Sequence, residues 1–255
     1  MYKIFNAMKL SISLYRLCLV MAISTGPLQA SDFLPKDYED EYVNTLSKFL
    51  EFSAYRYTDP ELDDFLNEFS PEELQEPCYF ETDNDEYNLL HYAARQGEYA
   101  LLKKLIENKA MNPEEKTLMT GRAVLHLAAW KGRLEVVKYL AGEDDEAPKV
   151  NLDATTPTGG FALYLASELG DDNRIGVIDV LLANGANPLQ VDQHGFTILH
   201  RAVEFNNMAL LIHLSKTYPE LLEKLKTVKA HYGDYTPLTL AEDLGRSKEA
   251  IDLLS

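Results

Sequence analysis

The sequence lacks any run of about 18 or more apolar residues, so no segment has the pattern of an ordinary membrane-spanning helix. Basic side chains are also scarce, because 24 Lys and Arg stand against 41 Asp and Glu and leave a formal net charge of -17. Phosphate backbones and anionic lipid surfaces repel such a chain, which argues against nucleic-acid binding and peripheral membrane docking. A basic partner is favoured instead. The 46% of apolar residues is enough for a sizeable core.

Cysteine is nearly absent as well, with Cys18 and Cys78 as the two examples, and no Asn-x-Ser/Thr acceptor occurs. Gly-rich phosphate loops, Gly-x-Ser-x-Gly elbows and paired-cysteine metal motifs are all missing. Three of the six histidines, namely His194, His213 and His231, have no cysteine or acidic residue at a spacing typical of metal ligands. We therefore predict no catalytic residue, no cofactor-binding residue and no metal site, and we expect a protein that is not an enzyme.

The first thirty residues have the layout of a secretory signal peptide. They hold three basic side chains and no acid: Lys3, Lys9 and Arg16. A short apolar run follows over residues 17–23, and small residues end the segment at Ala30. We expect cleavage after Ala30, which would leave a net charge of -20 and one cysteine in a periplasmic or secreted protein. The alternatives are that residues 1–30 form a buried helix of the fold, or that an internal start near Met21 gives a cytosolic form.

A repeat organises the rest of the chain. Five segments align around one position that is His, Tyr or Thr, and this position falls at His91, His126, Tyr164, His200 and Thr239. Its spacings of 35, 38, 36 and 39 residues follow from those numbers. Small Ala pairs, such as those at 93–94 and 128–129, would let neighbouring helices approach closely, and glycines mark helix ends.

This pattern resembles the ankyrin repeat, whose signature Thr-Pro-Leu-His-x-Ala covers each of these segments. The resemblance extends over residues 83–255 and implies an all-α fold, a solenoid of about five repeats. It also implies that His91, His126 and His200 make hydrogen bonds between repeats and are not metal ligands. The repeats are longer than the family's usual period, so we expect lengthened loops, one at 142–146, and an additional helical stretch at 219–225.

Residues 31–82 do not fit the repeat and are predicted to form an N-terminal helical cap that covers the end of the array. Helices are expected over 37–57 and 60–69, with a short turn from Pro71. The segment 31–80 holds 14 acids and 3 bases, which indicates either a solvated helical face or a docking surface for a basic partner. The predicted domains are thus 1–30, 31–82 and 83–255.

In the ankyrin family, partners usually contact the turn tips and the exposed face of the first helix of each repeat. The resemblance therefore nominates partner-binding positions on those segments: Tyr87, Arg95, Gln96, Arg122, Trp130, Lys131, Glu168, His194, Phe196, Glu204, Phe205 and Tyr235. Among them, Tyr87, Trp130, Phe196 and Phe205 are the predicted anchors, because large aromatics dominate interface energies. Acidic residues around them would steer and reject partners. Alternatively, Trp130 and Phe205 pack beneath the lengthened loops.

These features predict an exported, acidic protein, monomeric when free, that binds another protein. The combination of leader, repeat and acidity is similar to ankyrin-repeat immunity proteins encoded beside type VI secretion phospholipase effectors. That resemblance implies a toxin or lipase as partner and inhibition as the outcome. Two alternatives stay open, namely an effector or scaffold that binds a host protein, and an enzyme with an unrecognised catalytic segment within residues 31–82.

Overall fold

The computed structural model describes residues 59–67, 69–70, 74–75, 78–80, 85–144, 147–231 and 233–255. The chain divides into two compact units, Met1–Leu89 and Leu90–Ser255. The predicted signal peptide and the helix predicted over 37–57 lie outside the described residues. Within the described part of the chain, no helix has the length and apolar character needed to cross a membrane.

The first unit contains α3 (Asp59–Asn67), which confirms the core of the helix predicted over 60–69. Its apolar positions follow helical spacing, and Leu62 and Leu66 are buried. The unit also contains a short antiparallel hairpin, β1 (Cys78–Phe80) and β2 (Asp85–Tyr87), in which Cys78 pairs with Tyr87. The sequence analysis did not predict these strands, because three-residue strands are too short to show an alternating pattern.

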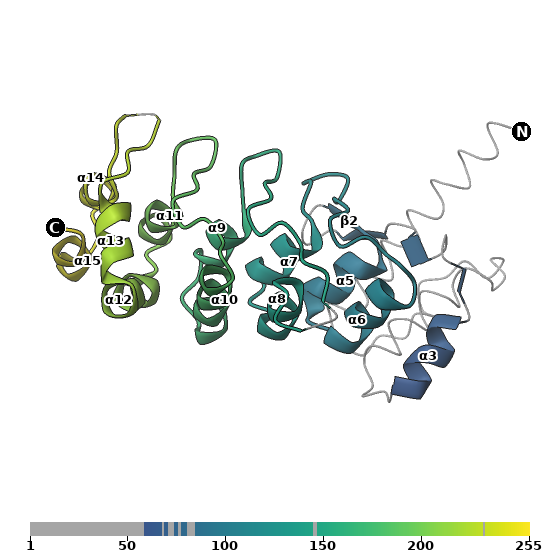
Figure 1. Ribbon diagram of the computed structural model, residues 1–255. Coiled ribbons are helices and arrows are strands. Elements are labelled where there is room, and N and C mark those ends of the chain that lie inside the picture. Colours follow the sequence, from purple (N-terminus) through teal and green to yellow (C-terminus); the bar gives the residue numbers. More distant parts are fainter. Residues whose placement is uncertain are drawn as a thin grey trace, which may run out of the picture. The chain divides into compact units, whose positions relative to one another are not determined.

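The second unit is an array of helix pairs that follow one another in chain order (Figure 1). The described residues contain five such pairs, α5 (Leu89–Gln96) with α6 (Tyr99–Glu107), α7 (Val124–Trp130) with α8 (Leu134–Leu140), α9 (Ala162–Ala166) with α10 (Asp172–Ala183), α11 (Ile198–Glu204) with α12 (Met208–Thr217), and α14 (Pro237–Asp243) with α15 (Lys248–Leu254). We call the first helix of each pair the inner helix. The long loops between pairs all extend to one side of the helices (Figure 1).

An additional helix, α13 (Pro219–Lys226), follows α12 and confirms the helical stretch predicted at 219–225. Pro219 is its first residue, where the missing N–H costs nothing. The preceding Tyr218 donates its hydroxyl to Asp179 Oδ1 at 2.9 Å, and His213 Nε2 lies 2.8 Å from the same oxygen. Burial and this hydrogen bond raise the pKa of Tyr218 to about 12. The start of α13 is therefore tied to α10 of the preceding repeat.

The alanine pairs of the first two inner helices lie in the buried core of the array. Ala93, Ala94, Ala128 and Ala129 have no exposed surface. Every residue of α7 from Val124 to Ala129 is buried, so this helix has no solvent-facing side before its last residue. A methyl side chain at such a contact permits a short distance between helix axes, which is the role predicted for the alanine pairs.

The three signature histidines, His91, His126 and His200, bridge successive repeats. His126 Nδ1 accepts the N–H of Ala123 at 3.1 Å, so its Nε2 carries the proton and donates to Ala154 O at 2.8 Å. His200 repeats this arrangement with Tyr235 O at 3.1 Å, and His91 Nε2 lies 2.9 Å from Glu115 O. Each ring therefore connects the start of an inner helix to the loop that leads into the next repeat, as the resemblance implied.

A second series of hydrogen bonds ties the ends of the inner helices to the following repeat. In each case a side chain of the next repeat donates to a carbonyl near the end of the helix: Arg133 to Arg95 O at 2.9 Å, Arg174 to Trp130 O at 2.9 Å, Asn207 to Ser167 O at 2.9 Å, and Arg246 to Val203 O at 2.8 Å. Carbonyls in the last turn of a helix lack the i+4 donor that carbonyls in the helix interior have. At each repeat junction the array therefore gives such a carbonyl a hydrogen-bond donor from the next repeat.

Glycine is required after the inner helices for two different reasons. Gly132 has a φ of 68°, which residues with a side chain rarely adopt. Glycine is therefore favoured at this position because of its backbone conformation. Gly170 has no positive φ, but a Cβ at that position would clash with the side chain of Asn207. Gly170 is therefore required for space, because Asn207 reaches past it to Ser167 O.

The buried histidines make stability depend on pH. Burial lowers the pKa of His126 to about 4, whereas an unfolded histidine has a pKa of about 6.5. Between these values the unfolded chain binds more protons, so acidification favours unfolding, and the loss is complete below about pH 4. We expect the free-energy difference between wild type and His126→Gln, measured by urea unfolding, to narrow by about 3 kcal/mol from pH 7.5 to pH 4.

The matched control is His231→Gln, which removes an exposed ring and should leave the wild-type pH profile unchanged. Burial also lowers the pKa of His200, so His200→Gln should reduce the acid dependence in the same direction. A constant difference between His126→Gln and wild type across this range would contradict the assigned origin of the acid sensitivity.

Candidate protein-binding site

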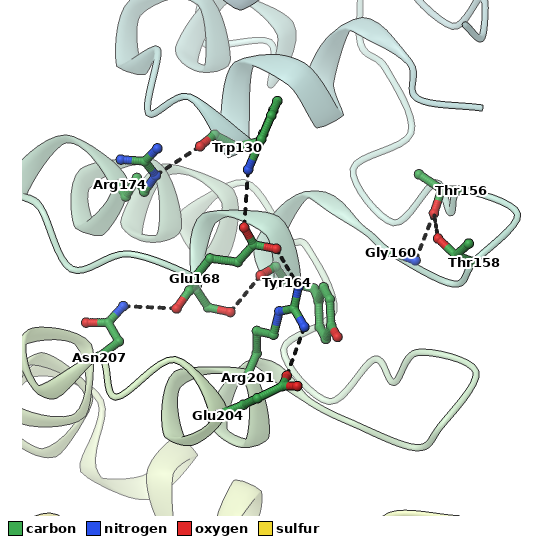
Figure 2. A network of polar contacts seen from close by, with 11 residues as sticks. Trp130, Thr156, Thr158, Gly160, Tyr164, Glu168, Arg174, Arg201, Glu204 and Asn207 are labelled. Atoms are coloured by element: carbon green, nitrogen blue, oxygen red, sulfur yellow. Dashed lines mark hydrogen bonds and ion pairs between the residues drawn. The ribbon is translucent and has the colours of Figure 1, made fainter. Parts of the chain in front are cut away.

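The last residue of α7 begins a polar and aromatic network on the inner helices. Trp130 Nε1 donates to Glu168 Oε2 at 3.2 Å (Figure 2). Two cations lie over its ring, with Lys131 Nζ 3.6 Å and Arg122 Cζ 4.6 Å from the centroid. The indole is half-buried, so these contacts fix an aromatic surface that solvent still reaches.

Arg201 of α11 is the centre of the same network. Its Nη2 donates to Glu168 Oε1 at 2.5 Å and its Nη1 donates to Glu204 Oε2 at 2.8 Å (Figure 2). The guanidinium carbon lies 4.4 Å from the Tyr164 ring centroid and 4.3 Å from that of Phe205. Arg201 is thus held by two carboxylates and two rings, a set that suits its planar, fully charged group.

The eight side chains form one connected group, which we call the inner-face network: Arg122, Trp130, Lys131, Tyr164, Glu168, Arg201, Glu204 and Phe205. Its members come from three successive repeats. The Arg201 and Glu168 side chains are only 18% and 16% exposed, whereas Phe205 is 44% exposed. Accessible aromatic groups therefore flank a mostly buried ion pair. Because these side chains are already held in one conformation, a partner that binds here has little side-chain entropy left to remove.

The third repeat departs from the histidine pattern, and this departure builds part of the network. Tyr164 occupies the signature position, and its ring packs against Arg201 of the next repeat. Burial raises the pKa of Tyr164, so the phenol is neutral at all physiological pH values. A histidine here would be shorter and would leave one face of the guanidinium uncovered.

Six of the predicted partner-binding residues meet in the network, namely Arg122, Trp130, Lys131, Glu168, Glu204 and Phe205. The sequence analysis missed Tyr164 and Arg201. A signal for Arg201 does exist, because the residue after the signature position is Tyr92, Leu127, Leu165 or Leu240 in the other repeats. A charged residue at a position that is otherwise apolar or aromatic indicates a local function.

The remaining predicted residues do not join the network. Tyr87 is 1% exposed, which corrects its assignment as an anchor, because a side chain this deep in the core cannot reach a partner. Phe196 stacks on His200 with centroids 5.1 Å apart, and Tyr235 donates its hydroxyl to Asp243 at 3.3 Å. His194 is exposed in the loop before α11. Arg95 and Gln96 are half-buried at the end of α5, one repeat before Trp130.

The charge of the network differs from that of the chain. Three cations and two carboxylates meet there, although the whole sequence carries a net charge of -17. Cations lie over the ring of Trp130, and an acidic residue of the kind expected around the anchors is also present, because Glu168 accepts a hydrogen bond from Trp130 Nε1. In the part of the chain that the structure describes, no group of three or more His, Cys, Asp or Glu side chains is arranged to hold a metal ion.

Comparison with known proteins places this geometry in a family. Residues 61–152 match the family of ankyrin repeats, in three copies. The chain contains ankyrin repeats. Helix pairs continue beyond the matched residues as far as α15, with Tyr164, His200 and Thr239 at the signature position, so the ankyrin array includes the helices that carry the inner-face network. Ankyrin repeats are protein-binding modules, so the array is a protein-binding module.

Several known proteins are similar in sequence to part of this chain. Palmitoyltransferase AKR1 of Lachancea kluyveri is 32% identical over 125 residues, and the same protein of Kluyveromyces lactis is 33% identical over 132 residues. In each case the match covers 49% of this chain and 16% of the relative. The putative ankyrin repeat protein FPV022 of Fowlpox virus is 29% identical over 134 residues, which cover 52% of this chain and 20% of the viral protein. The matched part is thus a small share of each relative.

Removal of Arg201 should destabilise the array because Glu168 would keep a mostly buried charge without its partner. We expect Arg201→Met to lower the free energy of unfolding by about 2 kcal/mol, below the usual cost for a fully buried pair because the site is partly solvated. Adding Glu168→Gln should recover about half of this loss, since the uncompensated charge is gone. Urea unfolding at pH 7 measures both values.

Lys138→Met serves as the control, because Lys138 pairs with Glu135 on an exposed helix face at 2.8 Å and should not change the unfolding midpoint. If the double variant is no more stable than Arg201→Met, the unpaired charge of Glu168 is not the cause of the lost stability, and the explanation is wrong.

Proposed function

We propose that this chain is an exported immunity protein that binds and neutralises a cognate toxin through the inner face of its ankyrin array. The inner-face network carries the proposal. Trp130 and Phe205 remain accessible, while Arg122, Lys131 and Arg201 lie against their rings. Tryptophan and arginine in such settings contribute most of the binding energy at protein interfaces.

The contacts within the network support tight binding for a physical reason. Immobilising long side chains at an interface costs about 0.5–1.5 kcal/mol for each of them. Arg201 and Glu168 are already fixed by one hydrogen bond of 2.5 Å to each other, and Arg201 also packs against two aromatic rings. A partner that contacts this surface therefore loses little of its interaction energy to ordering, and it can be held long enough to block an active site.

The export part of the proposal is supported by the first thirty residues. Three basic side chains, an apolar run and a small-residue site precede a body with a net charge of -20. An acidic body attracts basic partners over a distance and repels acidic ones, which suits a protein that must find one cognate toxin. Palmitoyl transfer is not part of the proposal, because the match to those relatives covers only 16% of their length.

Substitution of the accessible aromatics should separate binding from stability. The partner is isolated from the native cell by affinity capture with the wild-type chain and identified. We expect Trp130→Ala and Phe205→Ala each to weaken its binding about 30-fold or more by calorimetry, as for a central interface aromatic. Trp130→Ala should lower the free energy of unfolding by only about 1 kcal/mol, because the indole is half-exposed.

Leu189→Ala is the matched control, because Leu189 is 42% exposed in a loop outside the network and should leave binding unchanged. Excess wild-type protein should abolish the activity of the captured partner. A partner whose activity persists in the saturated complex would remove inhibition from the proposal, and equal losses of binding and stability in Trp130→Ala would make Trp130 a core residue.

Mass spectrometry of the protein from its native cell tests export. The layout of residues 1–30 predicts a mature chain that begins at Ser31 and is recovered from the periplasm or the medium. A cytosolic pool that starts at or near Met21 would be consistent with internal initiation. Recovery of a chain that begins at Met1 in every compartment would exclude the signal peptide.

A further inference from the structure

Arg122 and Arg201 have similar aromatic contacts but different polar partners. Arg122 Cζ lies 4.6 Å from the centroid of the Trp130 ring. Arg201 lies as close to two rings, and it also donates to Glu168 and Glu204. Among the residues that the structure describes, no oxygen accepts a hydrogen bond from the Arg122 guanidinium and no carboxylate pairs with it. The five N–H donors of this half-buried side chain are therefore available to a partner.

Arg122 is held at both ends. Its backbone N–H donates to Thr117 Oγ1 at 3.0 Å, and its carbonyl accepts from Thr117 N at 2.9 Å, which fixes it at the base of the loop before α7. The Trp130 ring on which the guanidinium lies is held in turn by the hydrogen bond from its Nε1 to Glu168. The unused donors therefore occupy a restricted region beside the indole, and a partner loses little energy to ordering them.

The charge of Arg122 belongs to a basic part of an acidic chain. Residues 90–140 hold nine basic and five acidic side chains, a net charge of +4, whereas the whole sequence carries -17. Lys116, in the same loop as Arg122, donates to Thr155 O at 3.2 Å, and a carbonyl does not neutralise its charge. Burial is the main cause of the low pKa of His126, and the charges of Lys116 and Arg122 lower this pKa further. The second repeat therefore has a positive field that its own acids do not cancel.

We propose that Arg122 binds a carboxylate of the partner, namely an aspartate or glutamate side chain that lies beside Trp130. This inference rests on the proposed function, in that it takes the inner face to be the protein-binding surface, and it names one group that the partner brings there. A carboxylate accepts two parallel N–H groups of a guanidinium, so one acidic side chain matches both the charge and the planar geometry of Arg122.

One carboxylate is compatible with a partner that is basic overall. The net charge of -17 attracts a basic protein over a distance, and the carboxylate opposite Arg122 then fixes the register of the complex. A basic protein without this group would bury Arg122 unpaired, which opposes its binding and gives specificity. Nucleic-acid phosphates would suit the guanidinium, but the acidic chain repels them.

A charge exchange across the interface tests the inference with the full chain and the captured partner. We expect Arg122→Gln to weaken binding about 30-fold or more by calorimetry, because the partner's carboxylate loses its counterion. Arg122→Lys retains the charge but not the paired donors, so it should weaken binding about tenfold. Arg122→Glu should abolish binding, and replacement of one aspartate or glutamate of the partner by lysine should restore it.

Lys138→Gln is the matched control, because it removes the same charge from an exposed face of the same repeat and should change the affinity by less than about twofold. Circular dichroism melting of Arg122→Gln should give the wild-type midpoint, since no hydrogen bond within the described array is lost. The inference is overturned if Arg122→Gln binds as well as Lys138→Gln, or if no acidic residue of the partner restores binding to Arg122→Glu.

Random peptides displayed on phage test the same contact without the natural partner. Peptides selected on the full chain should share an aspartate or glutamate, and they should bind Arg122→Gln at least about tenfold more weakly than wild type. Selected peptides that lack an acidic residue, or that bind both proteins equally, contradict the inference. Self-association of the chain that Arg122→Gln abolishes also contradicts it, because a second copy would then supply the carboxylate.

The two proposals fail in different ways. If the captured partner stays active in the saturated complex, inhibition is wrong, and the charge exchange still decides whether Arg122 binds a carboxylate. If excess wild-type protein inhibits the partner and Arg122→Gln inhibits it at the same concentrations, the proposed function stands and only the carboxylate contact is wrong.

Discussion

The array depends on hydrogen bonds that cross from one repeat to the next and end on backbone carbonyls. His126 donates forward to Ala154 O, and Arg174 donates back to Trp130 O. Both carbonyls lack partners within their own repeat, and an unpaired buried carbonyl costs about 1–3 kcal/mol. Each repeat therefore completes the polar groups of its neighbour as well as covering its apolar face, so a helix pair of this chain is unsatisfied when isolated.

The inner-face network arises where this scheme is interrupted. The third repeat has Tyr164 in place of the bridging histidine, and its contact with the fourth repeat runs through Arg201 and Glu168 on the inner helices as well as through the bond from Asn207 to Ser167 O. The junction is thus stabilised by side chains that also lie beside solvent. A backbone-directed bond would have been hidden, whereas this replacement presents charge and aromatic surface at the centre of the array.

Much of the fold follows from local sequence, whereas the site follows only in part. Alanine pairs, signature histidines and turn glycines are short-range patterns, so the helix pairs and the additional helix α13 were predictable. The contact of Arg201 with Glu168 joins residues 33 positions apart through unequal loops, and no local pattern indicates it. Tyr87 was wrongly assigned because a three-residue strand has no detectable period, so its burial was invisible.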